Sequence, residues 1–402
     1  MNQCCYQQKK ITSEKTEPSI RSLRFHRTPF DCLPRLKTRL GLRFREPLLK
    51  VIDTFPVNSF VSRTYRQTLR HLVGPVVWSV KLEVNNGCNL ACKMCYVPKG
   101  NDVLPLEDIE RLLDDIAGIG TRLEILGGEP LLREDLAEII RYAKEKARLP
   151  QVILYTNATL ADREWATALR HAGLDAALVT FISCNEKEVH AMGGSWNRTL
   201  EGIRNLKAAG IEVYTFTAVH AANIHRVKEI EQFVKENLGA HALFYQYIPQ
   251  EKDDPLIPDN TQWAQVKHWV LYEKNPPHAR FVRNFCTLSG SACSGGNFVY
   301  TAKVDGTVTP CPFISDIVLG SIKQESIWEI IRKRFTVEMF HEFQSLPAEC
   351  GECSYSDICN GGCKAGNKAL FGHYDRKDPR CLGPWLERSE DDKASDRLPC
   401  FF

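Results

Sequence analysis

The sequence predicts an α/β fold with a small cysteine-rich C-terminal domain. Between residues 80 and 273, short apolar segments typical of strands alternate with amphipathic segments typical of helices, which is the pattern of a parallel βα fold. In the last third of the chain, cysteines recur at short intervals. Three more cysteines follow the first expected strand directly, which indicates a metal centre at one end of the sheet.

The expected strands and helices alternate in chain order. The six strands cover residues 80–84, 123–126, 152–155, 177–182, 212–218 and 242–248. Between them, residues 106–116, 200–206 and 227–234 have apolar side chains at helical spacing. Glycines such as Gly118 and Gly210 follow these segments and are typical helix stops.

The loop after the first strand contains Cys88, Cys92 and Cys95, with the spacing Cys-x3-Cys-x2-Cys. Three thiolates on one short loop can bind three irons of a [4Fe–4S] cluster, which normally takes four Cys ligands. The fourth iron is then open to a substrate or cofactor. The alternative is zinc, but structural zinc usually has four ligands in paired spacings, and this loop offers three with no nearby His.

A second motif, Gly127-Gly128-Glu129-Pro130, follows the strand expected over residues 123–126. Glycines allow the backbone to approach a ligand closely, and a carboxylate such as Glu129 can pair with an ammonium group. Alone, the motif could be an ordinary strand-to-helix turn. Together with the cysteine loop, it resembles the signature of the radical SAM superfamily.

This resemblance covers most of residues 80–385 and implies a partial (β/α)6 TIM-like barrel with its function at the C-terminal strand ends. It implies that the Gly-Gly-Glu-Pro motif binds the amino group of S-adenosylmethionine. It also places Met94 against the adenine, where the family usually has an aromatic residue. Asn157 and Ser183 follow expected strands and would lie near the ribose or carboxylate of S-adenosylmethionine, although strand-end polar residues are also common turn formers.

The C-terminal cysteines resemble those of the SPASM domain, an extension of many radical SAM enzymes that binds two auxiliary [4Fe–4S] clusters. The implied ligands of auxiliary cluster I are Cys293, Cys311 and Cys363. The implied ligands of auxiliary cluster II are Cys350, Cys353, Cys359 and Cys381. Cys286 would complete cluster I, which is otherwise open. The alternative of two zinc ribbons fits less well, because Cys363 interrupts the second set. Three clusters are therefore expected.

The chain is predicted to have four parts: a basic extension over residues 1–79, a radical SAM core over 80–280, a SPASM domain over 281–385 and a tail over 386–402. The extension holds 15 Lys and Arg against 5 Asp and Glu, whereas the whole chain has a net charge of +3, so the remainder carries −7. We expect it to be partly disordered or helical. Its charge could contact an acidic peptide, a nucleic acid or a membrane surface, but a solvated basic face is the simpler interpretation.

Neither a signal peptide nor a membrane span is expected. The first residues are polar, and no apolar run reaches about 18 residues. The 16 cysteines therefore point to a cytoplasmic protein that uses its thiols for metal, in an anaerobic or well-reduced cell. There is no P-loop. His220 and His225 do not share a helix face and are predicted to lie at the surface.

These features predict a radical SAM/SPASM enzyme, an oxidoreductase or maturase that reductively cleaves S-adenosylmethionine to a 5′-deoxyadenosyl radical and abstracts hydrogen from a substrate. The electron donor would be a flavodoxin or ferredoxin, and nucleic acid is not expected as a partner. The sequence identifies no catalytic base. A non-catalytic iron–sulfur electron-transfer or scaffold protein is an alternative, but such a protein has no need for an open iron or an ammonium site.

The substrate is predicted to be a peptide or protein, with a tetrapyrrole or a sugar as the alternative. Sulfatase-activating relatives tend to have an Asp after the cysteine that corresponds to Cys311. This chain has Pro312 there, which disfavours that activity. Fold and cluster content cannot choose between the remaining substrate classes.

Overall fold

The computed structural model describes residues 77, 79–268, 293, 295–353, 356, 360–378 and 381. The predictions for the N-terminal extension, except its last few residues, and for Cys286, Cys359 and the tail lie outside this part of the chain.

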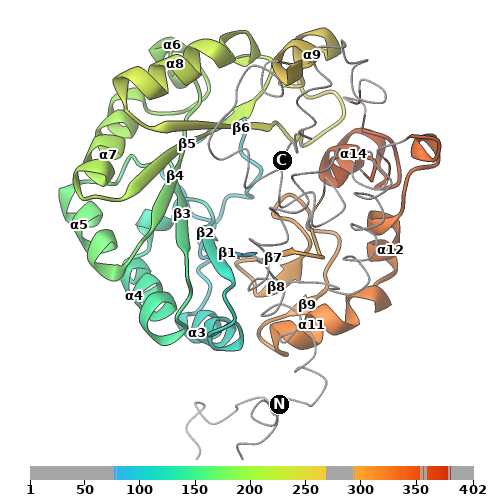
Figure 1. The fold of residues 1–402 in the computed structure, drawn as a ribbon, viewed down its shortest axis with the longest axis horizontal. Helices are drawn as coiled ribbons and strands as arrows, with labels where there is room; N and C mark the ends of the chain where they lie inside the picture. Colours follow the sequence, from blue (N-terminus) through green and yellow to red (C-terminus); the bar gives the residue numbers. More distant parts are fainter. Residues whose placement is uncertain are drawn as a thin grey trace, which may run out of the picture.

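Within the described residues, nine strands form one sheet in the order β6-β5-β4-β3-β2-β1-β7-β8-β9 (Figure 1). The first six are parallel and lie in chain order. Their bounds are β1 (Ser79–Glu83), β2 (Arg122–Leu126), β3 (Val152–Thr156), β4 (Ala176–Thr180), β5 (Glu212–Val219) and β6 (His241–Gln246). All six predicted strands are confirmed, each within two residues of its expected ends.

Helices lie on the outside of these strands, as Figure 1 shows. They are α3 (Leu106–Asp115), α4 (Leu136–Arg141) with its π-helical continuation η4 (Tyr142–Lys146), α5 (Arg163–Ala172), α6 (Glu186–Ala191), α7 (Trp196–Ala208), α8 (Val227–Asn237) and α9 (Asn260–His268). Two 3-10 turns, η3 (Pro130–Leu132) and η5 (Ile224–Arg226), follow strands β2 and β5. The three predicted helices are confirmed, and together with the parallel strands they form the expected α/β TIM-like partial barrel.

The cysteine-rich region continues the same sheet. Strand β7 (Val299–Ala302) pairs in parallel with β1, and β8 (Thr307–Thr309) and β9 (Gly320–Ser321) then pair antiparallel. The helical elements of this region are α11 (Ile327–Lys333), η7 (Arg334–Thr336), α12 (Glu338–Gln344), η8 (Ala348–Cys350) and α14 (Lys364–Phe371). The direct pairing of β1 with β7 places the two cysteine regions on one continuous framework.

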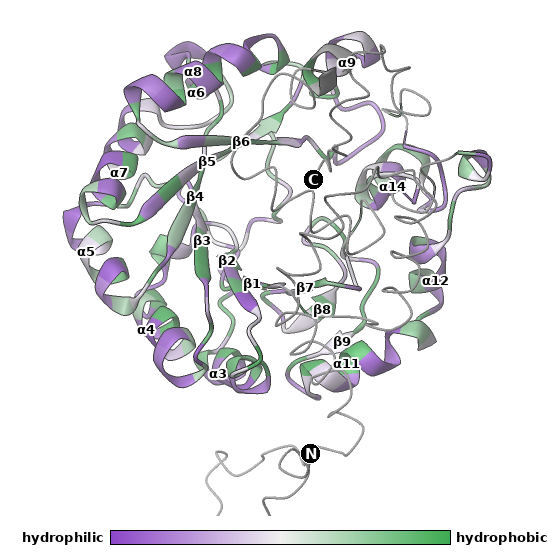
Figure 2. Cartoon of the chain, viewed as in Figure 1, coloured by the Kyte–Doolittle hydropathy of each residue, from purple (hydrophilic) through white to green (hydrophobic). Residues whose placement is uncertain are grey.

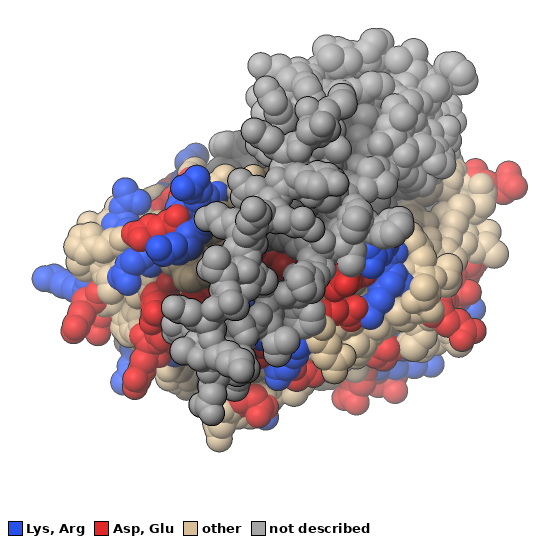
Figure 3. Space-filling model, turned by 90° about the horizontal axis from the view of Figure 1, so that it is seen from below, with Lys and Arg blue, Asp and Glu red and all other residues tan. Residues whose placement is uncertain are grey.

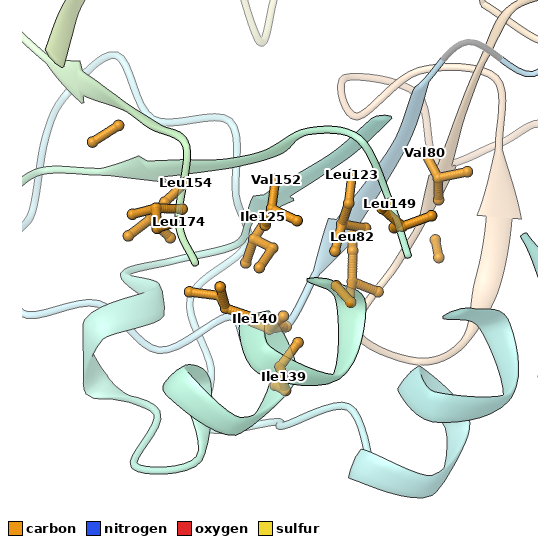
Figure 4. Packing of buried hydrophobic residues seen from close by; sticks show 14 of the residues in the cluster. Val80, Leu82, Leu123, Ile125, Ile139, Ile140, Leu149, Val152, Leu154 and Leu174 are labelled. Atoms are coloured by element: carbon orange, nitrogen blue, oxygen red, sulfur yellow. The ribbon is translucent and has the colours of Figure 1, made fainter. Parts of the chain in front are cut away.

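The two faces of the barrel strands differ in chemistry, because successive side chains alternate between faces. One face packs on the helices, where Val80, Leu82, Leu123 and Ile125 meet apolar residues of α4 (Figure 4). In Figure 2 these helices are hydrophobic inward and hydrophilic outward. The opposite face carries charged and aromatic side chains, namely Lys81, Glu124, Tyr155, Phe216 and Tyr245. A full barrel fills that interior with branched apolar residues, whereas this interior combines such residues, for example Ile153 and Leu178, with charges and aromatic rings.

The described surface carries charges of both signs. On the face drawn in Figure 3, Lys and Arg lie interspersed with Asp and Glu. Within the described residues, no helix is both long and apolar enough to cross a bilayer.

Candidate metal and cofactor centre

Cys88, Cys92 and Cys95 lie on the loop that leaves the C-terminal end of β1. Cys88 and Cys92 are half-buried, and Cys95 is exposed. Burial, followed by the neighbouring Cys95 and Cys88 thiols, raises the pKa of the Cys92 thiol to about 11. Thiolates this close repel one another, so the loop gains from a bound cationic centre, and thiolates are the ligands of iron–sulfur clusters. The donor set therefore fits the predicted cluster.

The cysteine loop is held by the segment after α6. The Lys93 N–H donates to the Met192 carbonyl at 3.0 Å. Gly193 has a φ of +82°, and a Cβ there would lie 2.4 Å from the Ala91 carbonyl oxygen, so only glycine fits. Met94 packs on the apolar cluster that includes Met192. The loop conformation is thus fixed by the barrel.

Gly127 and Gly128 lie close to neighbouring backbone carbonyl groups. From the sequence, we expected these glycines to make room for a ligand. A Cβ on Gly127 would lie 2.3 Å from the Asn85 carbonyl oxygen, and one on Gly128 would lie 2.0 Å from that of Gly87. The Glu129 N–H donates to the same Gly87 carbonyl at 2.7 Å. The glycines therefore join the end of β2 to the start of the cysteine loop.

Glu129 is fully buried at the end of β2. Its carboxylate accepts hydrogen bonds from the Thr156 hydroxyl (2.7 Å), the Asn157 N–H (2.7 Å) and the Leu131 N–H (3.0 Å). Burial raises the pKa of this carboxyl, against the effect of these donors. The side chain thus ties the end of β2 to the end of β3, and its pairing with an ammonium group stays a prediction.

Asn157 and Ser183 occupy different surroundings. The Asn157 amide donates to the Asn89 side chain at 3.0 Å and to the Cys88 sulfur at 3.8 Å, which brings the end of β3 to the cysteine loop. The Ser183 hydroxyl, after β4, donates to Glu188 at 2.5 Å.

The first auxiliary set gathers three thiols from distant positions. Burial, followed by the neighbouring Cys363, raises the pKa of Cys293 to about 11. Burial, followed by Cys293, also raises the pKa of Cys311. The Cys363 sulfur accepts the Gly366 N–H at 3.4 Å at the start of α14. Three thiols assigned to cluster I therefore lie in one environment.

The second set is separate from the first. Burial, followed by Cys381 and Cys353, raises the pKa of Cys350. Asp378 connects the sets, because its side chain accepts the Cys363 N–H at 3.1 Å and its carbonyl accepts the Cys381 N–H at 2.9 Å.

A bridge between the cysteine loops was missed from the sequence. The rings of Tyr96 and Phe313 lie with centroids 4.3 Å apart, and each residue is close in sequence to a cysteine that is predicted to be a ligand. The Lys303 ammonium donates to Glu83 at 2.9 Å and to the Pro312 carbonyl at 2.5 Å. The position of both residues next to cysteines was the only signal in the sequence. Which two residues contact each other can be seen only in the folded structure.

A cavity of about 560 Å³ lies at the C-terminal ends of β4, β5 and β6. Its lining includes Ser183, Met192, Tyr247 and His220. The prediction of a surface position for His220 is wrong, since this residue is fully buried at the end of β5. His225 is exposed as predicted, with 54% of its side chain accessible.

Comparison with known proteins agrees with this geometry. The profile of the radical SAM superfamily matches residues 82–234, and that of SPASM, an iron–sulfur cluster-binding domain, matches residues 293–354. The chain is 29% identical over 344 residues to the AdoMet-dependent heme synthase of Methanosarcina barkeri, covering 75% of this chain and 95% of the relative. It is 26% identical over 345 residues to the PqqA peptide cyclase of Gluconobacter oxydans, covering 80% of this chain and 95% of the relative.

A solved structure shares the fold. Streptococcus suis SuiB bound to S-adenosylmethionine superimposes with a TM-score of 0.62 at 14% identity, over 80% of this chain and 81% of SuiB. The two family profiles, the cysteine sets and the partial barrel agree. This chain belongs to the radical SAM superfamily and carries a SPASM domain, so it is an enzyme whose cofactors are S-adenosylmethionine and iron–sulfur clusters.

Proposed function

We propose that Cys88, Cys92 and Cys95 bind the cluster that activates S-adenosylmethionine. The bound cofactors supply the chemistry: one electron breaks the C5′–S bond, giving methionine and a 5′-deoxyadenosyl radical that takes a hydrogen atom from the substrate. The observation that carries this proposal is the convergence of three thiols with Asn157 and Glu129, at the C-terminal ends of three neighbouring strands.

The chain's own residues position S-adenosylmethionine across these strand ends. Gly127, Gly128, Glu129 and Pro130 form the amino-group side, where the rigid turn against Gly87 supports binding. Two polar residues, Asn157 and Ser183, contact the ribose or carboxylate. Met94 contacts the adenine, which is supported by its place in the apolar cluster beside the cavity.

The cysteine sets support three [4Fe–4S] clusters. Cys286 and Cys359 complete the auxiliary sets, and a flavodoxin or ferredoxin supplies the electron. Anaerobically reconstituted protein should then contain about twelve iron atoms per chain and release 5′-deoxyadenosine when reduced with S-adenosylmethionine. About four iron atoms, or stoichiometric zinc, would contradict this assignment.

For the substrate we propose a carboxylate-bearing tetrapyrrole bound on the inner face of the barrel. Phe216 and Tyr245 stack there with centroids 4.1 Å apart, and Tyr155 meets Phe216 edge-on at 5.5 Å. Lys81 and Arg122 both pair with Glu124, so this face carries two cationic side chains. Flat aromatic surfaces next to a cation suit a planar ring with carboxylates. The heme synthase relative supports this choice.

A peptide substrate, the first expectation from the sequence, is the second candidate, favoured by the PqqA peptide cyclase relative. The test is isotope transfer from substrate to 5′-deoxyadenosine. Reduced enzyme with S-adenosylmethionine and deuterated iron coproporphyrin III should yield deuterated 5′-deoxyadenosine. Absence of transfer from the porphyrin, with transfer from a deuterated peptide encoded beside the gene, would establish the second candidate.

A further inference from the structure

His220 is the feature of the cavity that the surrounding chain leaves unsatisfied. Its imidazole is fully buried, and neither ring nitrogen has a hydrogen-bond partner in the part of the chain that the structure describes. Buried polar groups are almost always paired, because an unpaired one has lost its hydration without replacement. An unpaired imidazole that lines a cavity therefore points to a ligand in that cavity.

The backbone around His220 is held rigidly. The Asn223 side chain accepts the His220 N–H at 2.9 Å and donates to the Ile182 and Ala218 carbonyls, each at 2.9 Å. The Tyr247 hydroxyl is already used, since it donates to Asp254 at 2.5 Å. The backbone that carries the imidazole is thus placed beforehand, which lowers the entropic cost of binding.

The cavity combines an apolar wall with polar groups, which include Lys93, Ser183 and His220. Ile182, Met192 and Leu256 line it and belong to the apolar cluster on which Met94 packs. Burial lowers the pKa of His220 to about 4, so at neutral pH one ring nitrogen donates and the other accepts. An apolar wall beside a neutral donor and acceptor suits the edge of a nitrogen heterocycle.

We propose that His220 hydrogen-bonds the base edge of adenine when S-adenosylmethionine occupies this cavity. The inference rests on the proposed function, which places the adenosine beside Met94. It adds a specificity-determining residue that contacts the base through a side chain at the end of β5. His220 is then a cofactor contact and has no part in holding the barrel together.

The test compares His220→Phe and His220→Gln with the wild-type enzyme, all anaerobically reconstituted. Equilibrium dialysis measures S-adenosylhomocysteine binding, and thermal unfolding is followed without ligand. His220→Phe should bind about three- to tenfold more weakly, as expected for loss of a neutral hydrogen bond. Its ligand-free unfolding temperature should not fall, because an unpaired buried polar group has been removed. His220→Gln should recover part of the affinity.

His171→Phe, at an exposed position on α5, is the matched control and should leave both measurements unchanged. The wild type should also prefer S-adenosylhomocysteine to S-inosylhomocysteine, and His220→Phe should lose this preference. Unchanged affinity in His220→Phe, or a lowered unfolding temperature with affinity retained, overturns the assignment of His220. A wild-type enzyme that neither binds S-adenosylhomocysteine nor cleaves S-adenosylmethionine overturns the proposed function as well.

Discussion

The two cysteine regions of this molecule are built in opposite ways. The loop with Cys88, Cys92 and Cys95 is fixed by the barrel, through the Met192 carbonyl, the close contact at Gly193 and the Asn157 amide. The segment around the second auxiliary set buries a larger share of polar side chains. Among the described residues from 345 onward, the polar Lys364, Asn367 and Asp378 are buried beside the apolar Ala365 and Tyr374.

The backbone of the second auxiliary region also departs from regular structure. Asn360, Gly361 and Gly362 have φ values of +47°, +82° and +83° in succession. Glycine adopts these values without strain and Asn tolerates them well, so the segment needs further contacts to keep this one conformation. A bound metal centre can supply such contacts, since ligation energy is also folding energy in small metal-binding regions. The barrel therefore holds one cysteine loop in advance, and we expect the other set to depend on its predicted cluster.

The largest effect should come from changing Cys88, Cys92 and Cys95 together to Ala. Cleavage of S-adenosylmethionine should vanish, and about four of about twelve iron atoms should be lost. The unfolding temperature should stay near that of the wild type, because the barrel holds the loop without them. Iron analysis, 5′-deoxyadenosine release and thermal unfolding measure the three quantities. A variant that unfolds would show that this loop, too, depends on metal.

Changing Cys350 and Cys353 to Ala should have the reverse pattern. Cleavage of S-adenosylmethionine should survive at least in part, while product formation fails and the C-terminal region loses stability. Product analysis is combined with limited proteolysis of the region after residue 345. If this variant is soluble and still makes full product, auxiliary cluster II is only a structural centre and the catalytic part of the comparison is wrong.

The Glu129→Gln variant tests whether the barrel side of the comparison includes a cofactor-binding carboxylate. An amide keeps one acceptor oxygen but presents an NH2 group to one of the donors from Thr156, Asn157 and Leu131. Loss of a charge-assisted bond is typically of order 1.5–3 kcal/mol, so affinity for S-adenosylmethionine should fall roughly tenfold or more. Iron content should be unchanged. Equal affinity in calorimetry would mean that the carboxylate serves only to join β2 and β3.

The difference between the two regions also explains what the sequence could predict. The six barrel strands are apolar runs bounded by turns, so local pattern is sufficient for them. Strands β7, β8 and β9 have two to four residues each, and the pairing of β7 with β1 joins residues far apart in the chain. Cysteine spacing was sufficient to propose the ligand sets, because spacing is local information, and the sets stay a prediction. The hydrogen bonds of Glu129 to Thr156 and Asn157 were not predictable, because these residues lie at and just after the end of the next strand.

The position of His220 also could not be predicted from local sequence. Its sequence neighbourhood gives no sign of burial, and the surface prediction failed because the cavity is formed by three strand ends. That burial has a measurable consequence in pH. Burial lowers the pKa of His220 from 6.5 to about 4, although Asp254 and Glu188 act to raise it. The folded state therefore prefers the neutral imidazole, whereas the unfolded chain takes up a proton below about pH 6.5.

The smallest expected effect is the pH dependence of stability that comes from protonation of His220. His220 adds no pH dependence to stability above about pH 6.5, and its contribution is lost as the pH falls toward about 4. At pH 5 the loss is about 2 kcal/mol relative to neutral pH. Urea unfolding of the wild type and of His220→Phe at pH 7.5 and pH 5 measures this loss of stability. Between the two pH values, the variant should lose about 2 kcal/mol less than the wild type. His171→Phe should keep the wild-type difference, because His171 is exposed. Equal pH dependence in wild type and His220→Phe would mean that the imidazole is hydrated. The cysteine loop and Glu129 would then be the remaining evidence that the barrel forms its site in advance.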